Sequence, residues 1–254
     1  MNQQTTAQLK RNLVGGEWIE GASVNANINP ANTDEIVGHF ARGTRADAAR
    51  AISSARAAFA DWRHSGPQVR HDILKAVSDR IAARNGELGE LLAREEGKTL
   101  HEATGEVMRV SQVFEFFAGE CLRQTGDLVD SIRPGIEVMM QREPVGVVGL
   151  ITPWNFPMAI PTCKIAPALA HGDCVVLKPA DHTPGCAWAL AEILHEAGTP
   201  PGVFNLVMGR GSEVGAEILE NPDIDAVSFT GSAATGRRVA EACAVAEEGE
   251  LTST

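Results

Sequence analysis

Polar side chains stand directly after several apolar runs of this sequence. Asn155 lies in the loop Ile151–Pro157, of sequence ITPWNFP, where two prolines restrict the backbone. An amide N–H donor held in a stiff loop suits the stabilisation of a developing oxyanion, because no reorganisation is needed when the charge appears. The structural alternative is that Asn155 caps the next helix and that Trp154 packs in the core.

A lysine and an aspartate follow the second apolar run. Lys178 and Asp181 flank the pair Pro179-Ala180. An acid at a strand end can bind ribose hydroxyls in dinucleotide folds, and a neighbouring ammonium can reach a hydroxyl or a phosphate. A surface ion pair would explain the same two residues.

A Gly-Ser turn opens a predicted helix near the end of the chain, in the segment Phe229–Gly236. Backbone N–H groups at a helix start, next to small residues, form a site for a pyrophosphate. An ordinary helix cap is the alternative. The G-x-G-x-x-G fingerprint is absent, which counts against the standard dinucleotide fold but not against nucleotide binding.

Four short apolar runs position these loops: Val145–Ile151, Cys174–Lys178, Val203–Val207 and Ala226–Phe229. Each run is apolar throughout and is followed by a helical segment, which is typical of a parallel sheet buried on both faces. Such a sheet binds ligands beyond the carboxyl ends of its strands. The sequence therefore predicts an α/β fold with its chemistry at the strand ends.

Helical periodicity dominates the first half of the chain after a turn-rich segment that reaches about Thr33 and contains one brief strand at Gly15–Ile19. A start signal at Thr44 opens a helix that runs to Trp62. Three more helices are predicted: one that opens at Pro67 and buries Val69, Ile73, Leu74, Val77 and Ile81, one over 87–97 and one over 100–122. They indicate a packed scaffold.

Two short strands flank a turn at Arg133-Pro134-Gly135, between Gly126 and Glu143. This pattern predicts a two-stranded arm.

Composition excludes several classes of protein. The net charge of −11 argues against a nucleic-acid partner, and no apolar stretch is long enough to span a bilayer. The first twenty residues lack the pattern of a secretory signal, so we expect a cytoplasmic protein. Five scattered cysteines indicate reduced thiols and no metal site, and Cys163, Cys174 and Cys186 fall in runs where a buried thiol is expected.

Four motifs in order resemble the aldehyde dehydrogenase superfamily: Pro153–Pro157, Lys178–Ala180, Pro201–Asn205 and Phe229–Ser232. The resemblance extends from about Gly15 to about Cys243 and includes Glu95-Glu96-Gly97-Lys98. It implies a Rossmann-type NAD(P)-binding domain over 1–124 and 145–254, an oligomerisation hairpin over 125–144, and oxidation of an aldehyde to the acid. The run Glu115–Thr152 is most similar to enzymes that oxidise carboxylate-bearing semialdehydes, such as those of succinate or 2-oxoglutarate (2,5-dioxovalerate).

The resemblance also implies roles for individual residues. Asn155 matches the oxyanion-binding asparagine, and Lys164 matches a lysine near the reaction centre, although an exposed helix cation is the alternative. Asp181 keeps a negative charge that would repel a 2′-phosphate, which favours NAD, with NADP possible. The implied cofactor-binding residues are Ile151, Thr152, Pro153, Trp154, Lys178, Ala180, Asp181, Gly211, Gly215, Phe229, Gly231 and Ser232.

The family pattern is lost after Ala244, where a strand bearing Glu-Leu-Gly-Gly-Lys would follow in the family. None of the five cysteines has the context of the family's nucleophile. We therefore expect a truncated chain without the catalytic domain, inactive and poorly soluble alone, whose full-length relatives take a small aldehyde and form homo-oligomers. The alternatives are a non-catalytic nucleotide-binding or interaction module derived from this family, and an unrelated doubly wound protein.

Overall fold

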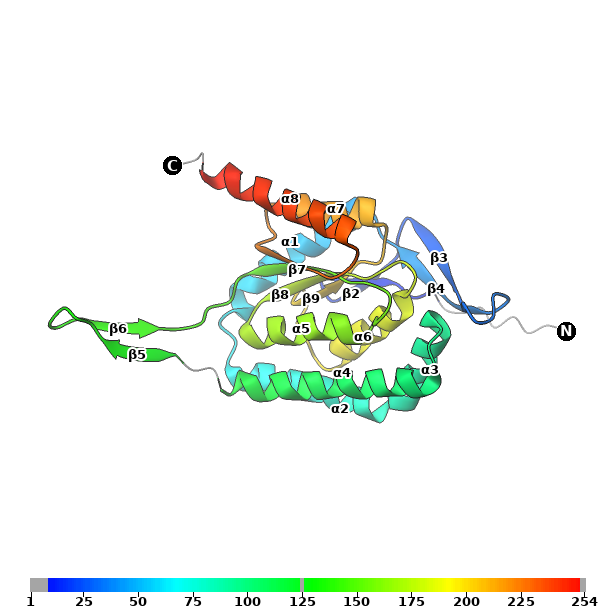
Figure 1. The fold of residues 1–254 in the computed structure, drawn as a ribbon, viewed down its shortest axis with the longest axis horizontal. Helices are drawn as coiled ribbons and strands as arrows, with labels where there is room; N and C mark the ends of the chain where they lie inside the picture. The colour runs from blue at the N-terminus through cyan, green and yellow to red at the C-terminus, as the bar shows by residue number, and fades with distance from the viewer. Residues whose placement is uncertain (1–8, 124–125, 252–254) are drawn as a thin grey trace.

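A six-stranded sheet forms the centre of the computed structural model, which describes residues 9–123 and 126–251 (Figure 1). The strand order is β10-β7-β8-β9-β1-β2. Four of these strands are parallel: β7 (Val147–Ile151), β8 (Cys174–Lys178), β9 (Phe204–Leu206) and β10 (Ala226–Phe229). They confirm the predicted runs, with β7 and β9 starting later than the apolar residues suggested.

Two antiparallel strands complete the sheet and make it mixed. β1 (Asn12–Val14) pairs with β9 through Leu13 and Leu206, and β2 (Glu17–Ile19) pairs with β1. Gly15 and Gly16 join them with φ of 61° and 83°, a left-handed turn that favours glycine. The sequence predicted only the second of these strands.

A separate hairpin consists of β3 (Ser23–Ile28) and β4 (Ile36–Arg42). Helical character was expected after about Thr33, but strand β4 occupies Ile36–Arg42, and the first helix begins at Arg45, after the predicted start signal at Thr44. The inward positions of this hairpin include Asn27, a buried amide bonded to a backbone carbonyl. Polar residues at buried positions removed the apolar alternation by which a strand is recognised.

Helices cover both faces of the sheet (Figure 1). α5 (Ala159–His171) and α6 (Pro184–Glu196) pack on one face, and α1 (Arg45–Trp62) packs on the other. A π-helical turn over Gly211–Gly215 leads into α7 (Ala216–Glu220), beside α1, and α8 (Ala233–Leu251) follows β10. Every residue of β8 is buried, as expected for a strand between two helical layers.

The remaining predicted helices form an outer layer against α5 and α6: α2 (Pro67–Ala83), α3 (Asn85–Glu96) and α4 (Leu100–Cys121). The predicted scaffold is therefore present, and the start signal at Thr44 is a capping box with Asp47. The prediction that Val69 is buried is wrong, since 49% of it is exposed. The buried residue of that turn is Arg70, whose guanidinium donates to the carbonyls of Arg63, Ser65 and Ala170.

The predicted arm extends away from the body of the molecule (Figure 1, green). It consists of β5 (Asp127–Asp130) and β6 (Glu137–Met140), joined through a turn in which Gly135 has a φ of 76°. All residues of both strands are exposed, including Leu128 and Met139. Among the helices that the structure describes, none is long and apolar enough to cross a membrane.

Candidate functional site

The loops that follow β7, β8 and β10 meet around one cavity of about 590 Å³. Most of the candidate residues line it, although they come from three distant parts of the sequence. The lining contains Ile151, Thr152, Pro153, Trp154, Asn155, Lys178, Ala180, Asp181, Phe229, Gly231 and Ser232.

The same cavity has four lining residues that sequence reasoning missed: Ile160, His182, Thr230 and Thr235. Thr235 had a usable signal, because it stands three residues after Ser232 in a predicted helix start. Gly211 and Gly215 do not line the cavity; they bound the π-helical turn before α7. Lys164 lies beside a neighbouring cavity instead.

Lys178 and Asp181 form an ion pair at the end of β8. Lys178 is the last residue of this strand and is only 7% exposed, and its Nζ lies 3.3 Å from Asp181 Oδ1. A surface ion pair is therefore the wrong description of the lysine. The ammonium is held at the cavity by a buried stem, with a half-buried carboxylate beside it.

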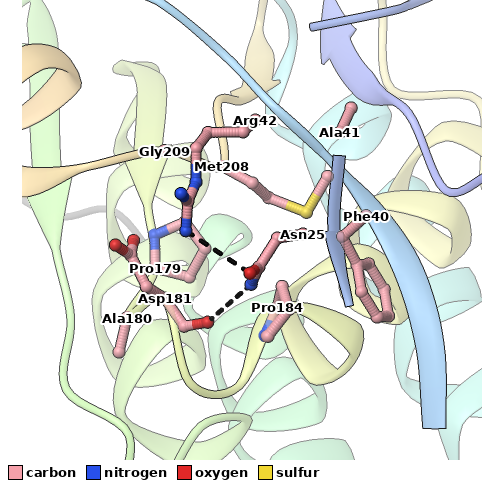
Figure 2. A pocket seen from close by; sticks show the side chains of 10 residues that line it. All are labelled: Asn25, Phe40, Ala41, Arg42, Pro179, Ala180, Asp181, Pro184, Met208 and Gly209. Carbon is pink, nitrogen blue, oxygen red and sulfur yellow. Dashed lines mark hydrogen bonds between the residues drawn. The ribbon is translucent and has the colours of Figure 1, made fainter. Parts of the chain in front are cut away.

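The β3–β4 hairpin fixes the segment that carries Asp181. Asn25 Nδ2 donates to the Asp181 carbonyl at 3.3 Å, and Asn27 Nδ2 donates to the His182 carbonyl at 2.7 Å. Figure 2 shows Asn25 between Arg42 and Asp181, at a small cavity behind the segment. The hairpin that the sequence did not reveal thus positions part of the candidate site.

Asn155 lines the cavity and does not cap a helix. Within the described residues its amide makes no hydrogen bond, and the N-cap of α5 is Met158. The first N–H groups of α5, from Met158 and Ala159, instead donate to Glu106 Oε1 at 3.1 and 3.0 Å. Trp154 is 52% exposed, so both alternatives for this loop are wrong.

The Gly-Ser turn is a helix cap that borders the cavity. Thr235 N–H donates to Ser232 Oγ at 3.2 Å, as the capping alternative predicted. A Cβ on Gly231 would lie 2.7 Å from Phe229 Cζ, so a larger residue at this position would require the Phe229 ring or the turn to shift. The cap and the cavity coexist, which leaves the start of α8 beside the ligand space.

Lys164 projects from α5 into the neighbouring cavity of about 470 Å³. Its Nζ donates to Ser228 Oγ at 2.7 Å, and burial lowers the pKa of its ammonium. The alternative of an exposed helix cation is therefore wrong. Ile160 and Thr230 border both cavities, so Lys164 lies close to the first one.

Comparison with known proteins decides the family. The model of the aldehyde dehydrogenase family matches residues 18–251. The chain belongs to the aldehyde dehydrogenase family. This membership confirms the resemblance inferred from the four motifs.

Curated relatives of this aldehyde dehydrogenase chain include several semialdehyde dehydrogenases. It is 43% identical to the alpha-ketoglutarate semialdehyde dehydrogenase of Haloferax volcanii, over 91% of this chain and 48% of that protein. It is 39% identical to the mitochondrial succinate-semialdehyde dehydrogenase of Arabidopsis thaliana, over 91% of this chain and 44% of the relative. The chain spans about half the length of the curated relatives it matches.

Solved structures of aldehyde dehydrogenases share the fold. The betaine aldehyde dehydrogenase of Staphylococcus aureus, in complex with NAD+, gives a TM-score of 0.91 at 37% identity, over 95% of this chain and 48% of that chain. This confirms the predicted α/β architecture with a Rossmann-type sheet and flanking helices.

None of the cysteines of this aldehyde dehydrogenase chain lines the cavity of about 590 Å³. Burial raises the pKa of the Cys174 thiol to about 12 and that of Cys186 well above its ordinary value. These two match the prediction of buried thiols, but Cys163 is exposed beside Lys164 and contradicts it. Cys163 lies on the side of α5 that faces the cavity of about 470 Å³. The apolar periodicity of the sequence did not distinguish this exposed side of the helix from its buried side.

Proposed function

We propose that this chain binds NAD as the nucleotide-binding part of an aldehyde dehydrogenase. The observation that carries the proposal is the convergence of three loops, after β7, β8 and β10, on one cavity. In a parallel sheet this edge is the ordinary place for a dinucleotide. The NAD+ complex of a relative with the same fold supports the assignment.

Lys178 and Asp181 would hold the adenosine ribose. A carboxylate accepts hydrogen bonds from vicinal hydroxyls, and the ammonium 3.3 Å away donates to them. The negative charge of Asp181 would repel a 2′-phosphate, so NAD is preferred over NADP. The residues present fit the cofactor, because the side chain of Lys178 is largely buried and the residue lines the cavity.

The start of α8 would hold the pyrophosphate. Gly231 allows the backbone to approach a ligand closely, and Ser232 presents a hydroxyl at the same helix start. Phe229 and the loop segment Ile151–Trp154 complete the wall of the cavity. The contribution of the helix start is electrostatic, since its N–H groups carry partial positive charge.

Asn155 would stabilise the oxyanion that forms when an aldehyde is attacked. Bound NAD accepts the hydride in such a reaction. The amide of Asn155 is unpaired within the described residues and is therefore able to donate to a developing charge. Lys164 would lie near the reaction centre. Since no cysteine of the chain lines the cavity, we expect the chain alone to bind NAD without turning over an aldehyde.

The substrate proposed for the whole protein is a carboxylate-bearing semialdehyde. The relatives named for 2-oxoglutarate and succinate semialdehydes support this class. We further propose a cytoplasmic protein in which the arm over 127–140 joins copies into a homo-oligomer, since its apolar side chains are exposed.

Two measurements on the purified chain test the proposal. Isothermal titration should detect NAD binding, with weaker binding of NADP, and an assay with 2-oxoglutarate semialdehyde or succinate semialdehyde should detect no steady formation of NADH. Saturable NAD binding without turnover would also fit a non-catalytic nucleotide-binding module. Activity of a longer form of the protein that contains this chain distinguishes the two, because only the dehydrogenase would show it.

A further inference from the structure

A lysine and a glutamate outside the cavity hold the loop that carries Asn155. Glu106 of α4 is almost completely buried, with 3% of its side chain exposed. Its Oε1 accepts the N–H groups of Met158 and Ala159, at the start of α5. Its Oε2 accepts Lys98 Nζ at 2.7 Å. Each oxygen of the carboxylate therefore has a fixed partner.

Lys98 extends this arrangement to Asn155 itself. It stands between α3 and α4, and its Nζ donates to the main-chain carbonyl of Asn155 at 3.2 Å. The same ammonium lies 4.3 Å from the centroid of the Phe156 ring, within the range of a cation–π contact. Only 12% of the Lys98 side chain is exposed, although the Asn155 carbonyl and the Phe156 ring that it contacts lie at the surface.

Together these contacts fix the Asn155 carbonyl and the residues that follow it. Glu106 anchors the residues after Asn155, and Lys98 holds the Asn155 peptide and the next side chain. The amide of Asn155 has no hydrogen bond of its own in the described part of the chain, so the direction of its Cα–Cβ bond depends on this backbone.

We propose that Lys98 and Glu106 are positioning residues that aim the Asn155 amide into the cavity. This inference rests on the proposed role of Asn155 as the oxyanion donor. Neither residue lines the cavity, so both act through the loop. Misplacement of a charge-stabilising donor by about 1 Å can cost about a hundredfold in rate, which gives such support a physical reason.

The test uses the Lys98→Met, Glu106→Gln double variant of the full chain. Glutamine keeps an oxygen acceptor for the start of α5, and the double change leaves no charge on the Lys98–Glu106 pair. Glu96, whose carboxylate lies 3.6 Å from the Lys98 ammonium, loses that ionic partner, so the fold of the variant is checked by a thermal melt. The contacts of the Lys98 ammonium with the Asn155 carbonyl and the Phe156 ring are lost, whereas an acceptor for the Met158 and Ala159 N–H groups remains. Lys98→Arg, which keeps a charged donor, is the rescue control.

Nuclear magnetic resonance of the nitrogen-labelled chain provides the readout. The Phe156 backbone amide reports on the hydrogen bond to the Asn155 carbonyl, and the Asn155 side-chain amide is assigned by its loss in Asn155→Ala. In the double variant both signals should shift, and the amides of the loop should exchange with solvent about tenfold faster. The amides of β8 should remain unchanged, and Lys98→Arg should restore the loop signals.

Unchanged loop signals and exchange rates in the folded double variant would overturn the inference. If that variant does not fold, the Glu106→Gln single variant, in which Glu96 remains an ionic partner of Lys98, gives the same readout with smaller shifts. An NAD titration of the unmodified chain runs beside these spectra. Failure to bind NAD would count against the proposed function alone, whereas an unmoved loop would count against the positioning role alone.

Discussion

The Asp181 carboxylate lies 3.3 Å from the Lys178 ammonium at the carboxyl end of β8. The lysine comes from a fully buried strand, and the aspartate comes from a turn whose carbonyls are held by Asn25 and Asn27. The pair is therefore fixed from two sides, by the sheet and by the β3–β4 hairpin. We expect a carboxylate fixed at this position to favour NAD over NADP, which carries an additional 2′-phosphate.

Removing the charge of Asp181 should relax the selection against NADP. In Asp181→Asn the ratio of NADP to NAD affinity should rise about tenfold, or about 1.4 kcal/mol, because the repulsion of the 2′-phosphate is lost. Isothermal titration of both cofactors measures the ratio. Asp79→Asn, which removes an exposed carboxylate paired with Lys75 on α2, is the matched control. An equal ratio in both variants would show that Asp181 does not face the phosphate.

Substitution by alanine should have different effects on NAD affinity at Gly231 and at Gly215, two glycines that the family resemblance assigned to the cofactor site. Gly231→Ala places a Cβ 2.7 Å from Phe229 Cζ and should displace the turn at the start of α8. We expect NAD affinity to fall at least about tenfold, roughly 1.4 kcal/mol. Gly215→Ala meets open space in a helical backbone, so it should leave affinity unchanged and preserve or raise the melting temperature. Equal losses of affinity would place Gly215 at the cofactor after all.

Glu95 should make the free energy of unfolding fall as the pH rises from 4.5 toward 7. Burial raises the pKa of its carboxyl from 4.5 to about 7, although Gly185 and Cys186 at the start of α6 donate to it. The folded state therefore favours the protonated acid more than the unfolded state does. Its contribution is fully present below pH 4.5 and is lost as the pH rises toward 7.

Denaturant unfolding at several pH values measures this contribution. Between these pH values the stability of the wild type should fall relative to Glu95→Gln, by up to about 1.4 kcal/mol per pH unit. The glutamine variant should be less stable overall, since it loses one acceptor at the start of α6, but it lacks the titrating proton. Parallel curves for the two proteins would contradict the raised pKa.

Lys164 should react with acylating reagents at lower pH than an exposed lysine does. Burial lowers the pKa of its ammonium, whereas the Asp79 side chain raises the pKa of Lys75. At mildly alkaline pH a larger fraction of Lys164 is the neutral nucleophile, and the cavity beside it admits a small reagent. Competitive labelling followed by mass spectrometry compares the two residues. Faster modification of Lys75 throughout the pH range would refute the expectation.

Much of the fold followed from apolar patterning in the sequence. β8 and β10 coincide with their predicted runs, and α1 begins after the predicted signal at Thr44, because local chemistry and burial agree there. β3 and β4 escaped notice because Asn27 is a buried polar residue that bonds to a distant carbonyl. Nothing local in the sequence indicates a partner 155 residues away.

The sequence predicted the part of the candidate site that follows from the topology of the sheet. Strand ends meet by topology, so Asn155, Lys178 and Ser232 could be brought together without a structure. The residues that support the Asn155 loop could not be predicted in this way. Lys98 reaches the loop from the α3–α4 connection and Glu106 from α4, and their contacts with the loop depend on how α4 packs beside α5.

The central claim is a formed NAD site in this chain, and titration of NAD into a small set of variants tests it most directly. The set consists of the unmodified chain, Asn155→Ala, and the Lys178→Ala, Ser232→Ala double variant, each shown to be folded by a thermal melt. If the site is formed, the first two should bind NAD saturably with similar affinity, and the double variant should lose at least about a hundredfold, or about 2.7 kcal/mol. Absence of binding to the folded, unmodified chain, or full binding by the double variant, would contradict the claim.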